Sequence, residues 1–417
     1  MIGLARFLPL RLNKNTLYTS IVMAGVLFTI SLRETAVNPI LYSLLDESSR
    51  VFKKDYGIKT LDEIETTKTQ KNFPELMQEF RTYPNLTLRY NKIVVLVMES
   101  INYKEFISAR KDIKQDFHQQ HQSNIISYRN YYSCNLDSYT GLYVMLNSVM
   151  IPYQAYVNEE EYNFLNRRPN LIKFFNRNAF KTCFLTSYGE QQKRFIPDYQ
   201  DWTELKCLKT FPNNYAIVNS VKIERAAEDF AVFPDLIKEL RNNRKIFLFQ
   251  ELVYGHTREW KKKTGINTID YYNRYFNALW ENLSRANLLD STLLVITSDH
   301  GPRKNQADKE NYHIPLLLSA KNLRTGYHDE FLSHIDFKNI LLGKSSGTYT
   351  IAEMQQIYTV GNSGDMVYGM INRSGKFIFI NNRTLETETN TDEDAVRSLN
   401  ADFAAYRNSF SELSKKK

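Results

Sequence analysis

The stretch "LLVITSDHGPRKN", residues 293–305, decides the fold class. It is an apolar run rich in β-branched residues that ends abruptly at Ser298, Asp299 and His300, before a Gly-Pro pair. Short apolar runs that stop at Gly and Pro are typical of core strands in α/β sheets. Ligands of open α/β sheets bind outside the carboxyl ends of the strands. Asp299 and His300 therefore indicate either a metal or catalytic site, or a plain turn in which the Asp accepts backbone N–H groups.

On either side of this run, strand and helix signals alternate along the chain. The strand signals and the best helical periodicity, at 270–289, favour a mainly parallel central sheet with helices on both faces. A hairpin is expected at 366–380, "MVYGMINRSGKFIFI", followed by a helical tail at 393–414. The predicted strands are 92–100, 180–189, 245–256 and 291–301.

The N-terminus predicts a membrane anchor. Arg6, Arg11 and Lys14 precede "NTLYTSIVMAGVLFTISL", an uncharged and mostly apolar run from Asn15 to Leu32. Its length is near the lower limit for crossing a bilayer, and the basic flank predicts a cytoplasmic N-terminus and an extracytoplasmic chain after it. A cleaved signal peptide is the alternative, although no convincing cleavage site follows.

These signals predict four parts of the chain. A single N-terminal transmembrane helix is followed by a juxtamembrane connector and a catalytic domain, and the C-terminal hairpin and helix complete that domain. The predicted boundaries are 1–35, 36–89, 90–345 and 346–417.

Composition narrows the class of protein. With 417 residues and 42% hydrophobic content, the chain is globular and has ample core. Its formal charge of +8 comes from scattered Lys and Arg without a nucleic-acid motif, so a membrane surface or a phosphate-bearing substrate is the better interpretation. The three cysteines lack metal-ligand spacing: either Cys183 and Cys207 pair and leave Cys134 over, or all three are buried thiols.

Carboxylates and imidazoles recur at the ends of the predicted strands. Glu99 follows "IVVLVM", His256 follows "FLFQELVYG", and His313 precedes the apolar run of "NYHIPLLL". Each alone is explained as readily by a structural role, but the chain has only seven His. Together with Asp299 and His300, this set favours a divalent metal with an open position, Zn²⁺ or Mn²⁺, with Mg²⁺ as the alternative.

A nucleophile is expected in "YYSCNLDSYTGLYVMLNSVMIPY", residues 131–153. Ser138 and Thr140 stand before "GLYVML", which predicts the first turn of a helix. A hydroxyl there faces backbone N–H groups and the positive end of the helix dipole, which suits an anionic transition state. A simple capping serine is the alternative interpretation.

In chain order, these features resemble the alkaline phosphatase and sulfatase superfamily. Within it, they are similar to the membrane-anchored lipoteichoic acid synthases, phosphoethanolamine transferases and glucan phosphoglycerol transferases. The resemblance covers roughly residues 90–345. It implies an alkaline phosphatase-like α/β fold and transfer of a phosphoethanolamine- or phosphoglycerol-type group from a membrane phospholipid to a cell-envelope glycan or lipid, through a covalent intermediate.

The resemblance also implies roles for individual residues. Glu99 in "VMES" and both residues of "SDHG", Asp299 and His300, would be metal ligands, with the nucleophile as a further ligand. His256 in "YGH" and His313 in "HIP" would hold the substrate phosphate, or a second metal where one binds. In the mechanism expected here they hold non-bridging oxygens or protonate the leaving group.

Ser138 is favoured as the nucleophile over Thr140, because it stands three residues before Gly141 and ten before Ser148, as the nucleophilic Thr of glucan phosphoglycerol transferases does. The usual residue in that branch is Thr, so the register of this assignment is open by two positions.

Two departures from the family keep alternatives open. The sulfatase pattern that yields formylglycine has Pro and Arg where this chain has Thr140 and Leu142. In addition, many of these transferases have several membrane spans, whereas one is predicted here. An anchored or secreted phosphodiesterase or sulfatase-like hydrolase, a membrane partner subunit that supplies further helices, and an inactive tethered binding protein are the alternatives.

The segment after His256 carries a basic cluster. In "GHTREWKKKTGINTIDYY", Arg258 and the lysines 261–263 could contact an anionic lipid or glycan. A solvated basic loop is the alternative for this segment.

Overall fold

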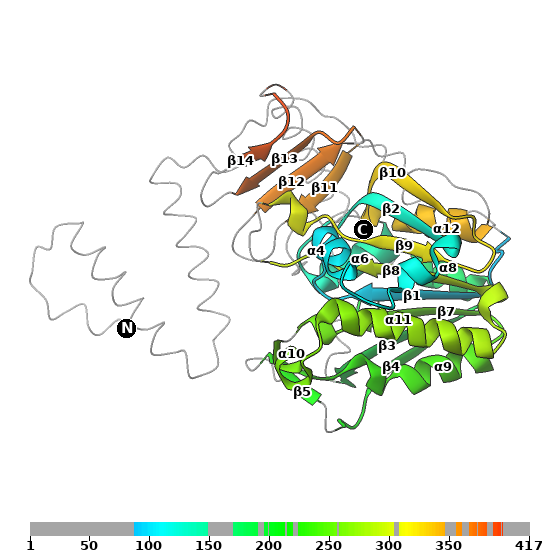
Figure 1. Ribbon diagram of the computed structural model, residues 1–417. Helices are drawn as coiled ribbons and strands as arrows, with labels where there is room; N and C mark the ends of the chain where they lie inside the picture. Colours follow the sequence, from blue (N-terminus) through cyan, green and yellow to red (C-terminus); the bar gives the residue numbers. More distant parts are fainter. Residues whose placement is uncertain are drawn as a thin grey trace, which may run out of the picture. The chain divides into compact units, whose positions relative to one another are not determined.

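The computed structural model describes most of the chain from residue 87 onward (Figure 1). The chain divides into two compact units, residues 1–69 and 70–417, and the first lies wholly outside the described residues. The predicted anchor at Asn15–Leu32 also lies outside the described residues. The same holds for nearly all of the connector and nearly all of the expected helical tail. No helix within the described ranges is long and apolar enough to cross a membrane. These ranges are 87–148, 170–190, 196–198, 200–212, 215–219, 224–256, 258–303, 308–346, 356–360, 367–372, 374–381, 387–392 and residue 394.

Ten strands of the described part of the chain form one sheet. Their order is β10-β2-β9-β8-β1-β7-β3-β6-β5, with β4 beside β3. The strands predicted from sequence correspond to β1, β3, β7 and β8. The bounds are β1 Lys92–Met98, β2 Ile125–Tyr132, β3 Lys181–Gly189, β4 Glu204–Leu208, β5 Tyr215–Asn219, β6 Glu224–Ala227, β7 Ile246–Leu252, β8 Thr292–Ser298, β9 Leu316–Ser319 and β10 Gly326–Ser333.

The sheet is mixed: five of the nine strand pairings described are parallel, in line with the expected mainly parallel sheet, and four are antiparallel. Its centre, β8-β1-β7-β3, is parallel, but β9 runs antiparallel to both β8 and β2, and β5, β6 and β3 pair antiparallel. A parallel neighbour needs a crossover, usually a helix. In the described part of the 299–315 connection the only helical element is the short 3₁₀ turn η8, Lys309–Asn311. The chain therefore re-enters the sheet from the edge at which β8 ended.

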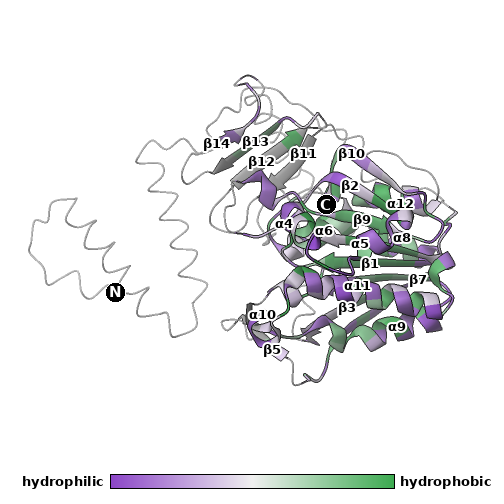
Figure 2. Cartoon of the chain, in the orientation of Figure 1, coloured by the Kyte–Doolittle hydropathy of each residue, from purple (hydrophilic) through white to green (hydrophobic). Residues whose placement is uncertain are grey.

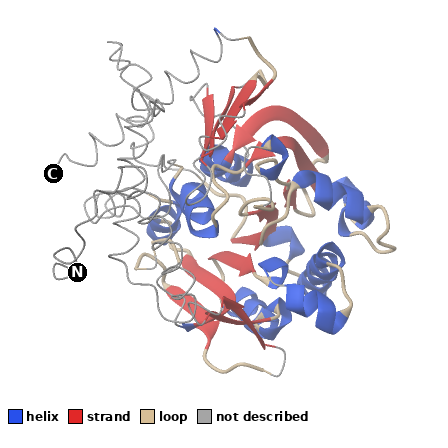
Figure 3. Ribbon diagram, turned by 90° about the vertical axis from the view of Figure 1, so that its left-hand side faces the viewer, coloured by secondary structure: helices blue, strands red, loops and turns tan. Residues whose placement is uncertain are grey.

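Helices cover both faces of the sheet, because its strands alternate their apolar side chains. Val94 and Leu96 of β1 belong to one core with α4, α9 and α11, whereas Val95 and Val97 belong to another with α6, α8 and α12. Figure 3 shows helices on either side of the strands, and in Figure 2 green predominates along the central strands. The helices are α4 Tyr103–Arg110, α5 Phe117–Gln120, α6 Ser138–Asn147, α8 Leu171–Arg177, α9 Phe233–Asn242, α10 Arg258–Thr264, α11 Thr268–Arg285 and α12 Phe337–Ser346.

A smaller antiparallel sheet contains the hairpin expected at 366–380. Its strands, in the order β11-β12-β13-β14, are Gln356–Val360, Val367–Asn372, Phe377–Asn381 and Thr387–Thr389. The buried Phe377 and Phe379 pack against Tyr132, Leu136 and Tyr312 of the larger sheet and its loops. The hairpin thus supports the loop that leads into α6.

None of the three cysteines forms a disulfide bond in the structure. Cys134 and Cys183 are buried and Cys207 is half-buried. Burial raises the pKa of the Cys183 thiol to about 12. The sequence left two alternatives, and the structure has the one in which Cys183 and Cys207 form no disulfide.

Candidate active site and metal centre

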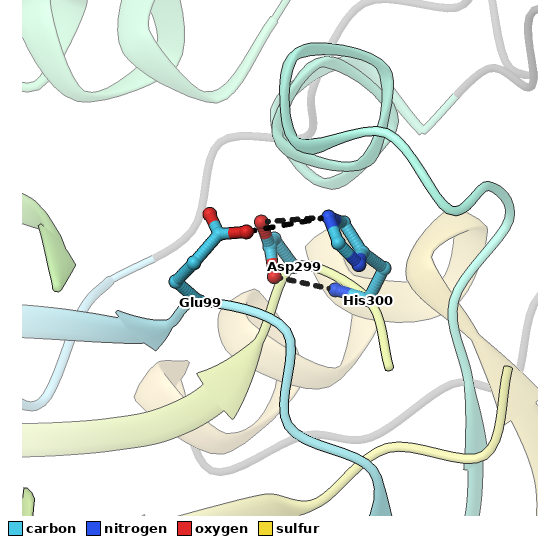
Figure 4. A group of neighbouring side chains, drawn as sticks. All are labelled: Glu99, Asp299 and His300. Carbon is cyan, nitrogen blue, oxygen red and sulfur yellow. Dashed lines mark hydrogen bonds and ion pairs between the residues drawn. The ribbon is translucent and has the colours of Figure 1, made fainter. Parts of the chain in front are cut away.

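Glu99, Asp299 and His300 converge where two adjacent parallel strands end (Figure 4). Met98 of β1 lies in register with Ser298 of β8, so the residues that follow them meet at the carboxyl edge. The candidate ligand atoms of the three residues lie within 4.8 Å of one another. His300 Nε2 is 3.6 Å from Glu99 Oε1 and 3.4 Å from Asp299 Oδ2.

The turn after β1 is fixed by hydrogen bonds to this cluster. Ser100 has a φ of 58°, in the left-handed region, which costs an L-residue about 1–2 kcal/mol. Its N–H donates to Asp299 Oδ1 at 2.9 Å and its hydroxyl donates to Glu99 Oε1 at 2.6 Å. The Ser298 hydroxyl joins the two strands by donating to the Met98 carbonyl at 2.7 Å. The carboxylates are therefore held by a strained but well-bonded backbone.

Burial and neighbouring charges shift the pKa values of Asp299 and Glu99 in opposite directions. Burial, together with the neighbouring Glu99 charge, raises the pKa of Asp299 well above its usual range. Burial alone would raise the pKa of Glu99 too, but the charges of His256, His300 and Arg303 outweigh it and the net effect is to lower the pKa. A cation between the two carboxylates would favour the ionised form of both.

The donor set fits a divalent metal. Asp299 Oδ2 is buried and has no hydrogen-bond partner. Burial lowers the pKa of His300 to about 4, so its imidazole is neutral at pH 7. His300 Nδ1 lies 2.6 Å from the Gly301 carbonyl, a contact that requires the proton on Nδ1 and makes Nε2 the ring nitrogen whose lone pair can bind a metal. Two carboxylates and a neutral imidazole suit Zn²⁺ or Mn²⁺.

Ser138 faces this donor set. It is the first residue of α6 and is half-buried, with Asp137 as the N-cap. The Ser138 hydroxyl donates to Glu99 Oε2 at 3.0 Å and lies 3.3 Å from His300 Nε2. Thr140, in contrast, is fully buried and its hydroxyl donates to Asp137 Oδ1 at 3.3 Å. Of the two candidate nucleophiles, the structure brings Ser138 to the cluster.

His256 lies in a short 3₁₀ turn, η6 (Tyr254–His256), after β7. Its charge helps to lower the pKa of Glu99, and its Nδ1 is buried without a hydrogen-bond partner. The turn passes so close to β1 that a Cβ on Gly255 would lie 2.3 Å from the Glu99 carbonyl oxygen. His256 is therefore within electrostatic reach of the donor set.

Two buried residues hold the His256 turn. Asp229 Oδ1 accepts the Val253 N–H at 2.8 Å and Oδ2 accepts the Tyr254 N–H at 3.1 Å. The Tyr272 hydroxyl accepts the Gly255 N–H at 2.7 Å. Burial raises the pKa of Asp229 to about 7. Asp229, the first residue of the 3₁₀ turn η5 (Asp229–Ala231), was not among the predicted site residues, since its local sequence carries no signal of this contact.

His313 and Arg258 are not brought into the cluster by described contacts. The His313 ring stacks between Tyr103 and Tyr132, with centroid distances of 4.4 and 4.9 Å, and its Nε2 donates to the Arg129 carbonyl at 2.6 Å. Arg258 is the first residue of α10, and its side chain lies outside the described part of the structure. The substrate-binding roles expected for both stay predictions.

Arg303 also reaches the donor set, although the sequence analysis passed over it. Its guanidinium lies 3.2 Å from His300 Nε2. The sequence feature that could have pointed to Arg303 is the position of a cation three residues after His300, in the same turn.

The sequence profile of the sulfatase family matches residues 91–343, more than half of the chain. The chain belongs to the sulfatase family. The family is one of metal-dependent enzymes, and the matched range contains Glu99, Ser138, Asp299 and His300. The resemblance drawn from the order of motifs is thereby confirmed at family level.

Solved structures share the fold at low identity. A protein of the alkaline phosphatase superfamily from Vibrio parahaemolyticus is 12% identical, with a TM-score of 0.61 over 85% of this chain and 99% of that one. A lipoteichoic acid synthase from Listeria monocytogenes is 12% identical, with a TM-score of 0.54 over 82% and 98%. A phosphonate monoester hydrolase from Silicibacter pomeroyi is 11% identical, with a TM-score of 0.51 over 78% and 94%. No curated protein matches the sequence.

Proposed function

We propose that this sulfatase-family enzyme transfers a phosphoethanolamine- or phosphoglycerol-type group from a membrane phospholipid to a cell-envelope glycan or lipid. The observation that carries the proposal is the Ser138 hydroxyl at the start of α6, 3.0 Å from Glu99 Oε2 and 3.3 Å from His300 Nε2. The absence of the formylglycine pattern at Thr140 and Leu142 argues against sulfate ester cleavage. The fold shared with a lipoteichoic acid synthase agrees with this choice.

A divalent metal held by Glu99, Asp299, His300 and Ser138 would act as a Lewis acid that lowers the pKa of the serine hydroxyl and neutralises phosphate charge. In the first step, the Ser138 oxygen bonds to phosphorus while the bond from phosphorus to the diacylglycerol oxygen breaks. The Ser138 hydroxyl donates its hydrogen bond to Glu99 Oε2. Because the pKa of that carboxyl is lowered, the proton passes on to solvent, and Ser138 takes a proton back from solvent when it is released in the second step.

His256 has two tasks in this proposal. It protonates the departing diacylglycerol oxygen in the first step, and it takes a proton from the acceptor hydroxyl in the second. The acceptor oxygen then attacks the same phosphorus and Ser138 is released. His313 and Arg258 are proposed to hold the phosphate and the anionic acceptor or lipid, as the sequence analysis predicts.

The cellular setting is part of the proposal. The apolar run Asn15–Leu32 anchors the chain with its N-terminus in the cytoplasm, so the catalytic unit lies outside and its donor is the adjacent phospholipid. A membrane partner that supplies further helices is compatible with a single anchor.

A phosphodiesterase that passes the group to water is the second candidate. One predicted span offers less lipid access than several, and the fold is also shared with a phosphonate monoester hydrolase. An inactive binding protein is disfavoured, because Glu99, Ser138, Asp299 and His300 are all present and converge.

Product analysis separates these functions. The full chain in detergent, loaded with Zn²⁺ or Mn²⁺, is incubated with head-group-labelled phosphatidylethanolamine or phosphatidylglycerol, with and without an envelope glycan extract. The transferase predicts labelled glycan or lipid that depends on Ser138; release of the free phospho-head group at an unchanged rate in both conditions would favour the hydrolase.

A further inference from the structure

Arg303 lies at the open side of the donor set. Its guanidinium is 3.2 Å from His300 Nε2, the same atom that lies 3.3 Å from the Ser138 hydroxyl. The cation and the candidate nucleophile therefore approach a single atom, so one phosphoryl group can contact both. Ser138 is half-buried and Arg303 is exposed, so this space is open to solvent.

The backbone before Arg303 is held rigidly. The Gly301 N–H donates to the Asn311 carbonyl at 3.0 Å, and a Cβ at Gly301 would lie 2.3 Å from that oxygen. The close packing, followed by Pro302, fixes the direction in which the chain leaves His300. The turn thus places the Arg303 backbone beside the cluster, within reach of its side chain.

The charge of Arg303 acts on the donor set and is not neutralised locally. It contributes to lowering the pKa of both Glu99 and His300. Two other described cations do have partners: Arg129 pairs with Asp329, and Lys309 lies over the Phe377 ring. Among the described residues, no carboxylate oxygen is recorded within ion-pair distance of the Arg303 guanidinium.

We propose that Arg303 binds a non-bridging oxygen of the substrate's phosphoryl group. The planar guanidinium suits phosphate oxygens, and it would stabilise charge that develops as the Ser138 oxygen attacks. His256, on the β7 side of Glu99, and Arg303, on the His300 side, then flank the phosphoryl group with two donors. This inference rests on the proposed function for its substrate, but the anion site itself can be measured without turnover.

The test measures binding of inorganic phosphate to the full-length, Zn²⁺-loaded protein by isothermal titration calorimetry. Arg303→Ala is expected to weaken phosphate binding about tenfold to 100-fold, and Arg303→Lys less, because a charge-assisted hydrogen bond is lost or replaced by a point charge. Arg324→Ala is the matched control: Arg324 is also exposed, but it follows β9 at the opposite edge of the sheet. It should bind phosphate as wild type does.

Zinc content and phosphodiester turnover are measured on the same samples. The inference is overturned if Arg303→Ala binds phosphate as tightly as wild type, if wild type binds none, or if the variant loses its zinc, which would make Arg303 a support of the donor set. Arg303-dependent phosphate binding without any turnover of phosphodiesters would uphold this inference while rejecting the proposed function.

Discussion

Replacing Gly141 with Ala tests how closely α6 must approach the metal ligands. A Cβ at Gly141 would lie 2.6 Å from the Asp299 carbonyl oxygen, about 0.8 Å inside the 3.4 Å at which ordinary contacts begin. The atom it meets is backbone, so α6 or the Asp299 turn must move. Overpacking of this kind costs about 1–3 kcal/mol, and the better helix propensity of Ala returns about 1 kcal/mol. We expect the free energy of unfolding to fall by up to about 2 kcal/mol.

The functional loss should be larger than the loss of stability. Ser138 stands one turn before Gly141, and a misplacement of about 1 Å in a catalytic group costs on the order of 100-fold in rate. The assays are urea unfolding, zinc stoichiometry and turnover of a chromogenic phosphodiester. Gly326→Ala is the matched control, because nothing lies within 4 Å of a Cβ there. Wild-type rate and stability in Gly141→Ala would refute the inferred packing.

The remaining predictions concern the nucleophile, the His256 turn and a buried histidine. Ser138→Ala should lower kcat by on the order of 1,000-fold or more, whereas Thr140→Val should cost only about 1 kcal/mol of stability, since its hydroxyl bonds Asp137; the reverse result in kinetics would reassign the nucleophile. Asp229→Asn should lower kcat about tenfold in wild type but have little further effect in a His256→Ala background; equal losses in both backgrounds would show that Asp229 does not act through His256. Burial lowers the pKa of His334 to about 3, below its ordinary value of 6.5. The contribution of this buried neutral imidazole to folding stability is therefore complete above pH 6.5, and it is lost as the pH falls and the unfolded state takes up the proton. When the pH falls from 7.5 to 5, the free energy of unfolding measured in urea should decrease by about 2 kcal/mol more in wild type than in His334→Gln. A difference between the two proteins that does not change with pH would contradict the assigned burial effect.

The sequence predicted those parts of the fold that depend on local periodicity. The apolar run before Asp299 and the one before Glu99 gave two adjacent strands, and because parallel strands end at one edge, the meeting of Glu99, Asp299 and His300 could be expected. The antiparallel course of β9 could not be predicted from the sequence, since it depends on a connection that returns along the same edge of the sheet. β2 and β10 were missed for a similar reason: their Tyr- and charge-rich sequences become strands through pairing.

The identity of the nucleophile and the environment of His313 could not be predicted from the sequence. Ser138 and Thr140 are two residues apart, and a helix separates them by about 200°, so only the structure could show which of them faces Glu99 and which bonds Asp137. His313 was expected to face the substrate because of its motif. Its observed stacking between two tyrosines depends on segments brought together by tertiary pairing.

The central claim is that Ser138 carries the phospho-group, and intact-mass analysis after incubation with phospholipid tests it most directly. The full-length protein, loaded with Zn²⁺ or Mn²⁺, is mixed with phosphatidylethanolamine or phosphatidylglycerol and acid-quenched, alongside Ser138→Ala and Thr140→Val. The account predicts an adduct with the mass of one phospho-head group on wild type and on Thr140→Val, and none on Ser138→Ala. An adduct that persists in Ser138→Ala, or none on a metal-loaded wild type that turns these lipids over, would contradict it.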